Sequence, residues 1–175
     1  MKAYKILFVA ACALLGMTAC SDNDKTKKLN ESDMYYTGIF NGEDVTKNSA
    51  KGDDMRYMGS TRVYDENGKI ASYWIGWRLP LNERGSIYFN FYSMPTTGIF
   101  KLRNVTRENS PIIVTQNGNE YLPGTTPFNL AINAVIDYAW RTPVVLGDAT
   151  GILYNSHNAN DSVAISIAFM IGPGK

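Results

Sequence analysis

Residues 55–79 read MRYMGSTRVY-DENG-KIASYWIGWRL, and this stretch decides the fold class. Met55–Tyr64 and Lys69–Leu79 each contain aromatic and β-branched residues, and the polar segment Asp65–Gly68 lies between them. The Asn-Gly pair in that segment favours a tight hairpin turn, because both residues tolerate positive φ. The stretch therefore predicts two antiparallel strands joined by a short turn.

The same pattern of alternating segments and turn residues continues through the rest of the chain. Pro80–Gly85 is expected to form the turn that follows the hairpin, and no window of about 12 residues shows helical periodicity. Further strands are expected at Tyr35–Phe40, Gly85–Ser93, Thr97–Arg103, Pro111–Thr115, Phe128–Tyr138, Val144–Tyr154 and Ser162–Ile171. These segments predict a single antiparallel all-β domain of about 8–10 strands. A lipocalin-like meander barrel and a β-sandwich both remain open, since periodicity does not separate them.

Alternation also assigns side chains to the two faces of a strand. Trp74 and Trp77 fall on opposite faces, so one sheet face cannot bury both. In Gly85–Ser93 one face carries Ile87, Phe89 and Phe91, and the other carries Tyr88, Asn90 and Tyr92. In Phe128–Tyr138 unbroken alternation puts Phe128, Leu130, Ile132, Ala134, Ile136 and Tyr138 on one face. Gly147 and Gly151 predict a bulge or bend in Val144–Tyr154.

The N-terminus has the order of features expected of a secreted lipoprotein. A basic head at Met1–Lys5 precedes an apolar stretch, Ile6–Gly16, that is too short to span a bilayer. Small residues then precede Cys20, and the run resembles the lipobox of bacterial lipoproteins, in which the cysteine is acylated and becomes the first mature residue. Residues 1–19 are thus predicted to be a signal peptide, residues 20–34 a lipidated flexible tether and residues 35–175 the all-β domain. The alternative is an ordinary secretory signal, with Cys20 a bystander.

Composition limits the classes of partner. Loss of Lys2 and Lys5 with the signal peptide lowers the basic residues from 17 to 15 against 16 acidic ones, a balance of −1. So neutral a chain has no electrostatic footprint for nucleic acid. Cys12 and Cys20 are the two cysteines, so a mature domain has no disulfide and no thiol nucleophile. No motif for a cofactor is present, and none is expected.

Catalytic and metal-binding candidates are few. His157 is the single histidine and lies in a polar segment between two expected strands, where a solvated turn residue is the simpler interpretation. Asp137 and Asp148 lie in strand-like segments. A glycosidase would need two carboxyl groups about 5–10 Å apart across a cleft, and nothing in the sequence indicates such a pair. We expect no catalytic residue and no metal ligand.

Aromatic residues are the strongest candidates for ligand contact. Trp74, Trp77, Tyr88 and Tyr92 are the predicted ligand-binding residues, because an exposed ring can stack on a sugar or cap an apolar pocket. Burial of the same rings in the core is the competing interpretation.

Several short stretches resemble those of uncharacterised small outer-membrane lipoproteins of Bacteroides-like bacteria. They are Tyr36–Gly42, Pro127–Leu130, Pro143–Gly147, Gly151–Asn155 and Asp161–Val163. The resemblance implies an outer-membrane lipoprotein, anchored through lipid on Cys20 in the periplasmic leaflet or at the cell surface. We expect a non-enzymatic domain that binds a glycan or a small apolar molecule. The alternatives are an accessory subunit that docks on another envelope protein and, third, a hydrolase.

Overall fold

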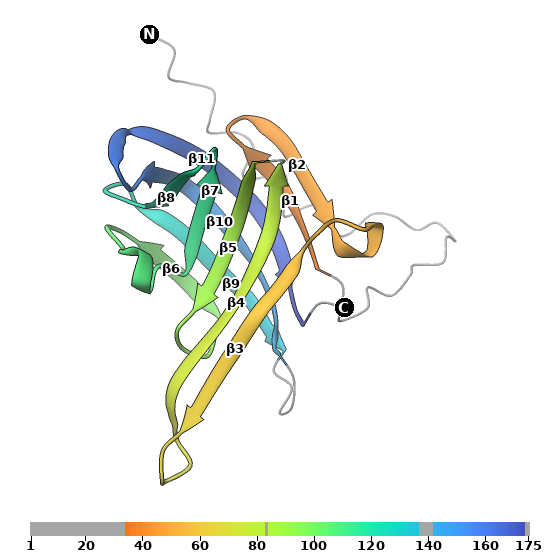
Figure 1. Ribbon diagram of the computed structural model, residues 1–175, viewed down its shortest axis with the longest axis vertical. Coiled ribbons are helices and arrows are strands. Elements are labelled where there is room, and N and C mark those ends of the chain that lie inside the picture. The colour runs from red at the N-terminus through yellow and green to blue at the C-terminus, as the bar shows by residue number, and fades with distance from the viewer. Residues whose placement is uncertain (1–33, 83, 137–141, 174–175) are drawn as a thin grey trace.

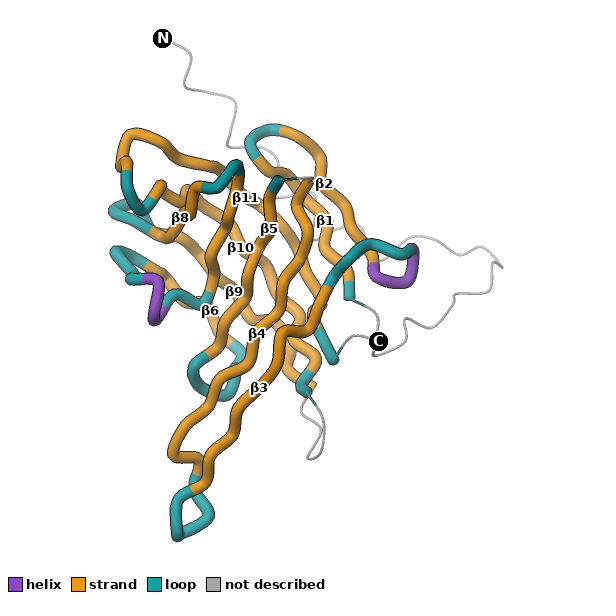
Figure 2. Tube along the Cα trace, viewed as in Figure 1, coloured by secondary structure: helices purple, strands orange, loops and turns teal. Residues whose placement is uncertain are grey.

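The computed structural model describes residues 34–82, 84–136 and 142–173, and within them the protein is all-β (Figure 2). The strands are β1 (Tyr35–Phe40), β2 (Glu43–Asn48), β3 (Arg56–Tyr64), β4 (Ile70–Asn82), β5 (Gly85–Phe91), β6 (Gly98–Leu102), β7 (Ile112–Gln116), β8 (Asn119–Pro123), β9 (Phe128–Ile136), β10 (Val144–Asn155) and β11 (Asn158–Ile171). Two single helical turns, η1 (Ser49–Lys51) and η2 (Arg107–Asn109), lie between strands. The predicted all-β class is confirmed.

The 11 strands form one antiparallel sheet, which curls into a half-barrel (Figure 1). The sheet branches at β10, because its first part pairs with β9 and its last three residues pair with β8. The β9 branch ends at β6, whereas the β8 branch continues through β7, β5 and β4 to β3. The two branches diverge, and residues 92–97 cross from the end of β5 to the start of β6.

The hairpin predicted from residues 55–79 is present as β3 and β4, and it projects beyond the other strands (Figure 1). The predicted turn at Pro80–Gly85 begins too early, because β4 continues to Asn82. Pro80 lies past the last β3–β4 pair, Arg56 with Arg78. Because β3 no longer pairs with β4 at this position, the missing N–H of Pro80 leaves no hydrogen bond to β3 unmade.

Two strands that the sequence did not predict complete the sheet. β2 is mostly exposed and pairs only with β1, so it carries no alternation of buried and exposed residues. β8 is a five-residue strand that ends in Pro123. Its position is set by the pairs that it makes with β7 and β10, which are tertiary contacts and not local ones.

A bulge in β9 overturns the predicted unbroken alternation of that strand. Asn133 has no partner on β10, where the register shifts at Gly147. Beyond this point Val135 packs against the core and Ile136 is exposed. Gly147 is required here, because a Cβ at that position would lie 2.2 Å from the Ala131 carbonyl oxygen. The bulge predicted from the glycines of β10 is therefore present, and its extra residue lies on β9.

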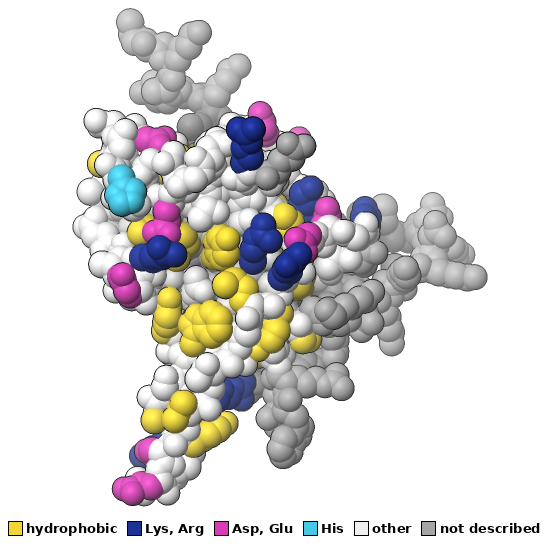
Figure 3. All heavy atoms as spheres, viewed as in Figure 1, with side chains coloured by type: hydrophobic (Ala, Val, Ile, Leu, Met, Phe, Trp, Pro, Cys, Tyr) yellow, Lys and Arg dark blue, Asp and Glu magenta, His cyan; other side chains and the backbone are white. Residues whose placement is uncertain are grey.

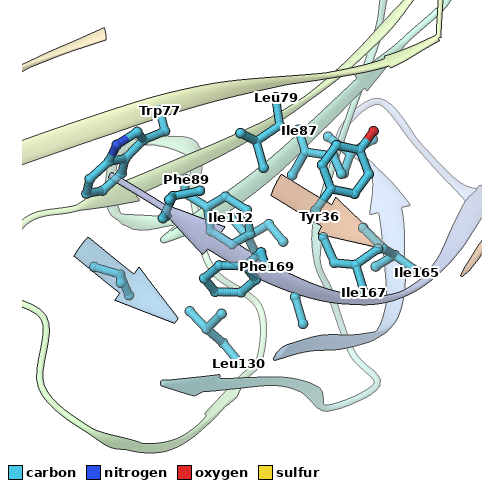
Figure 4. Close-up of a cluster of buried hydrophobic side chains, with 14 of the residues drawn as sticks. Tyr36, Trp77, Leu79, Ile87, Phe89, Ile112, Leu130, Ile165, Ile167 and Phe169 are labelled. Atoms are coloured by element: carbon cyan, nitrogen blue, oxygen red, sulfur yellow. The ribbon is translucent and has the colours of Figure 1, made fainter. Parts of the chain in front are cut away.

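The interior of the half-barrel is filled by side chains from facing walls. Figure 4 shows Phe89 of β5 and Phe169 of β11 pointing toward one another, and their ring centroids are 4.4 Å apart. Ile87 and Ile167 are buried in the same cluster. The inner face therefore forms a packed core.

Two long-range hydrogen bonds fasten these walls together. The Tyr36 hydroxyl on β1 donates to the carbonyl oxygen of Pro80 on β4. The Trp77 indole N–H donates to the carbonyl oxygen of Gly172, just after β11, at 2.6 Å. Both side chains are fully buried, so each bond satisfies a polar group inside the core.

The predicted signal peptide and Cys20 lie outside the described residues. The same holds for residues 20–33 of the predicted tether. Met34, the last residue assigned to that tether, is fully buried and its carbonyl oxygen accepts a hydrogen bond from the Ser49 amide. Met34 therefore belongs to the packed domain and not to the tether to which it was assigned.

Candidate functional site

Trp77 does not contribute to any surface site. Its side chain is 0 % exposed, and the indole packs against Tyr57 and Phe91 with ring centroids 6.3 Å and 6.0 Å away. No ligand can reach the ring without unfolding the core. The prediction that Trp77 binds ligand is therefore corrected, and the expectation that Trp74 and Trp77 separate onto opposite faces is confirmed.

Trp74 lies on the outer face of β4, where it covers two glycines. A Cβ built on Gly76 would lie 2.7 Å from Cζ2 of the indole, and one built on Gly59 would lie 3.4 Å from Cζ3. Gly59 and Gly76 are paired across β3 and β4. The six-membered ring is therefore seated on a strip of backbone that no side chain interrupts. Its half-buried state leaves part of the ring in contact with solvent.

The outer face next to Trp74 is neutral. Thr61 is the cross-strand partner of Trp74 on β3, and Asn90 is the partner of Gly76 on β5. Tyr92 follows β5 directly and is 45 % exposed. We call Trp74, the paired glycines and these three polar neighbours the Trp74 platform. In Figure 3 hydrophobic side chains gather on the face formed by β3, β4 and β5.

Tyr88 belongs to the same outer face but to a different neighbourhood. It is half-buried and stands between Arg78 of β4 and Ile113 of β7, its two cross-strand partners. Arg78 is four residues from Trp74 along β4, which is about 13 Å of extended strand. Trp74 and Tyr88 thus lie in different neighbourhoods, and Tyr92 follows Phe91, the cross-strand partner of Ile75.

A charged cluster surrounds Arg78 on the outer face. Asp54 accepts a hydrogen bond from Nε of Arg56 at 2.6 Å and lies 3.5 Å from Arg78. The hydrogen bond with Arg56 lowers the pKa of the Asp54 carboxyl, and the charges of both guanidinium groups act in the same direction. Arg78 also donates to the Ser86 hydroxyl at 3.0 Å. Arg78 therefore already has an ionic partner in the segment before β3 and a hydrogen-bond partner on β5.

A pocket of about 250 Å³ lies where the two branches of the sheet diverge. Its wall is mainly apolar, with side chains from the end of β5, the crossing segment, β6 and β9. Among them are Phe91, Met94, Pro95, Phe100, Leu130 and Ile132. We call it the β5–β6 pocket. Its volume is below the range of about 300–1,000 Å³ that drug-sized ligands occupy, so it suits one ring or one short apolar group.

Asn90 and Tyr92 belong both to the Trp74 platform and to the β5–β6 pocket. Asn90 is 8 % exposed, and a Cβ on Gly76 would lie 3.1 Å from its Oδ1. None of the side-chain hydrogen bonds found among the described residues involves the Asn90 amide. The amide borders the pocket, so it can pair with a polar atom of a ligand there.

Sequence reasoning found Tyr92 but not the rest of the pocket. Phe100 and Leu130 were assigned to strands, and for Leu130 the alternation placed the side chain on the apolar face. The pocket depends on the branching at β10, which no local pattern encodes. Asn90 offered a weak signal, because an amide between two tyrosines on an otherwise aromatic strand is unusual for a face that only meets solvent.

The sequence candidates for catalysis do not assemble within the described residues. His157 is exposed in the turn between β10 and β11. Asp148 accepts a hydrogen bond from the Asn133 amide at 2.6 Å on the outer face, and Asp137 lies outside the described residues. No group of three or more His, Cys, Asp and Glu side chains in the described ranges could hold a metal ion.

A separate hydrogen-bonded cluster holds the corner of β8, β10 and β11. Asp161 accepts from the Tyr121 hydroxyl at 2.9 Å and from the Asn155 amide at 2.8 Å. Burial raises the pKa of Tyr121, and the neighbouring carboxylate adds to the effect. Because every polar atom named here faces another, we interpret the cluster as structural.

Among the described residues, no helix is long and apolar enough to cross a bilayer. Comparisons of the chain with protein-family models, with curated proteins and with solved structures found no match.

Proposed function

We propose that this chain is a lipid-anchored protein of the cell envelope whose β-domain binds a small ligand without chemical conversion. The anchor is the lipid on Cys20, and the location is the outer membrane, in the periplasmic leaflet or at the surface. The ligand is a glycan ring or a small apolar group. The observation that carries the binding role is the β5–β6 pocket, which combines an apolar wall with the buried Asn90 amide.

Several features of the pocket support binding over core packing. Phe100 lines it and is 39 % exposed, so an apolar ring already meets solvent at the rim. β6, which carries Phe100, pairs only with β9. A ligand that covers the ring would remove apolar area from water, which contributes about 25 cal/mol per Å².

The test is a binding screen with the full chain. The probes are neutral monosaccharides and the uncharged apolar dye N-phenyl-1-naphthylamine, measured by calorimetry and by dye fluorescence. Phe100→Ala removes one wall of the pocket and should weaken the binding of any pocket ligand about tenfold, from the loss of roughly 1.4 kcal/mol of ring contact. Ile99→Ala is the matched control, because Ile99 is the adjacent residue of β6 and is 72 % exposed outside the pocket.

Binding that weakens in Phe100→Ala and not in Ile99→Ala supports the proposal. If neither class of probe binds, or if the two variants behave alike, the pocket is not a ligand site.

One observation favours a second function, that of an accessory subunit docked on another envelope protein. The β3–β4 hairpin projects from the domain, and four apolar side chains along it are exposed (Figure 3). These are Met58, Val63, Tyr64 and Ile70. A projecting arm with apolar residues is typical of a protein contact. Removal of these side chains would abolish association with an envelope partner and leave ligand binding unchanged.

A further inference from the structure

The backbone of two glycines fixes the position of the half-buried Trp74 ring on the outer face. Gly59 and Gly76 are opposite one another on β3 and β4, and the indole lies across both. Any larger residue at Gly76 would collide with the ring at 2.7 Å. The outer edge of the six-membered ring, from Cζ2 to Cζ3, therefore lies next to the backbone of both strands. A ring that is positioned in this way and is still partly exposed can offer a face for stacking.

The groups around the ring indicate the chemistry of the occupant. Thr61 and Tyr92 supply hydroxyls, and Asn90 supplies an amide. The guanidinium of Arg78, farther along β4, pairs with Asp54 at 3.5 Å and donates to Ser86. An anionic ligand would need a free cation beside the ring. A purely apolar ligand would displace water from the Asn90 amide without replacing its hydrogen bonds.

A neutral carbohydrate has the complementary surface. One side of a pyranose ring presents C–H groups that stack on an aromatic face, while its edge carries hydroxyls that pair with amides and phenols. We propose that the Trp74 platform and the β5–β6 pocket form one continuous site for a neutral oligosaccharide. One sugar ring stacks on Trp74 and a neighbouring ring enters the pocket, with Asn90 and Tyr92 contacting both.

This inference rests on the proposed function, because it takes the pocket as one half of the site. It adds the substrate class and a minimum length. A monosaccharide engages the pocket alone, whereas an oligosaccharide also uses the indole. Binding should therefore strengthen with chain length, and the increment should depend on Trp74.

The experiment uses the full chain in detergent and measures Kd by calorimetry. The probes are cellohexaose, maltohexaose, xylohexaose and chitohexaose, each with its monosaccharide. Trp74→Ala should weaken the best hexasaccharide about tenfold, Trp74→Phe should retain part of the affinity, and monosaccharide binding should not change. Gly76→Ala keeps the indole but displaces it, and should also weaken the hexasaccharide. Tyr64→Ala is the matched control, an exposed ring on the same hairpin away from the platform.

A second readout protects against loss of folding. Stacking on Trp74 should change the tryptophan fluorescence when the hexasaccharide binds, and the change should disappear in Trp74→Phe. Failure of all four hexasaccharides to bind, or equal affinity in Trp74→Ala, overturns the oligosaccharide site. If the dye still binds and still depends on Phe100, the proposed pocket survives that failure. If the dye and the monosaccharides also fail, the proposed function falls with it.

Discussion

The contrasting burial of Trp74 and Trp77 leads to a quantitative prediction on stability. Trp77→Phe keeps an aromatic ring but removes the N–H that donates to Gly172 at 2.6 Å. Leaving that carbonyl unsatisfied in the core costs about 1–3 kcal/mol, and the void left by the smaller ring adds about 1 kcal/mol. We expect Trp77→Phe to lower the free energy of unfolding by about 2–4 kcal/mol. For a domain of this size the melting temperature should fall by about 8–16 °C.

Trp74→Phe is the matched comparison on the same strand. The indole of Trp74 lies on the outer face, where solvent fills the space that a smaller ring leaves. This variant should cost less than about 1 kcal/mol. Urea unfolding followed by far-ultraviolet circular dichroism measures both variants without using tryptophan as the probe. The reasoning is refuted if the two substitutions have equal effects, or if Trp74→Phe is the more damaging.

Three further predictions follow from the same structure. Burial and the charge of Asp53 raise the pKa of the Tyr36 hydroxyl above its ordinary value. The stability that the protonated hydroxyl contributes is therefore complete below the unfolded pKa of about 10 and is lost as the pH rises through the folded pKa. In Tyr36→Phe, urea titrations at alkaline pH should show a smaller loss of stability. Gly38→Ala should lower the free energy of unfolding by more than about 3 kcal/mol or prevent folding, because φ is +152° and a Cβ would lie 2.0 Å from the Ser166 carbonyl oxygen. A melting temperature equal to that of the parent would contradict the β1–β11 register. Cys20→Ser should release the protein from the membrane fraction, and mass spectrometry of the parent should find acyl chains on the cysteine; an unmodified thiol would disprove the anchor.

Local patterns were sufficient where the strand itself carried the information. The hairpin at residues 55–79 and the two faces of β5 followed from alternation and one Asn-Gly pair. They were sufficient because each strand has one face in the core and the other outside. The same logic separated Trp74 from Trp77 without any structure.

Local patterns failed where long-range pairing decided the outcome. The phase of β9 changes at Asn133, because β10 bends past it at Gly147. Tyr92 was selected for its ring, yet the partners that form a pocket with it come from β6 and β9, and β9 is more than 30 residues away. The pocket arises only when the sheet branches, so no single segment could have indicated it.

The packing of the inner face decides where a ligand can bind at all. In a barrel with an open interior, residues such as Phe89 and Ile87 would line a central cavity. Here Phe89 meets Phe169 from the facing wall, and Trp77 is bonded to the end of β11, so those inner positions are occupied by core contacts. The ligand that we propose would therefore bind where the sheet is discontinuous or where an outer side chain presents a ring. The β5–β6 pocket lies where the sheet is discontinuous, Trp74 presents a ring on the outer face, and Asn90 borders both. Because Asn90 borders both places, we propose an extended chain of sugar rings, with one ring at each place, and not a single compact molecule.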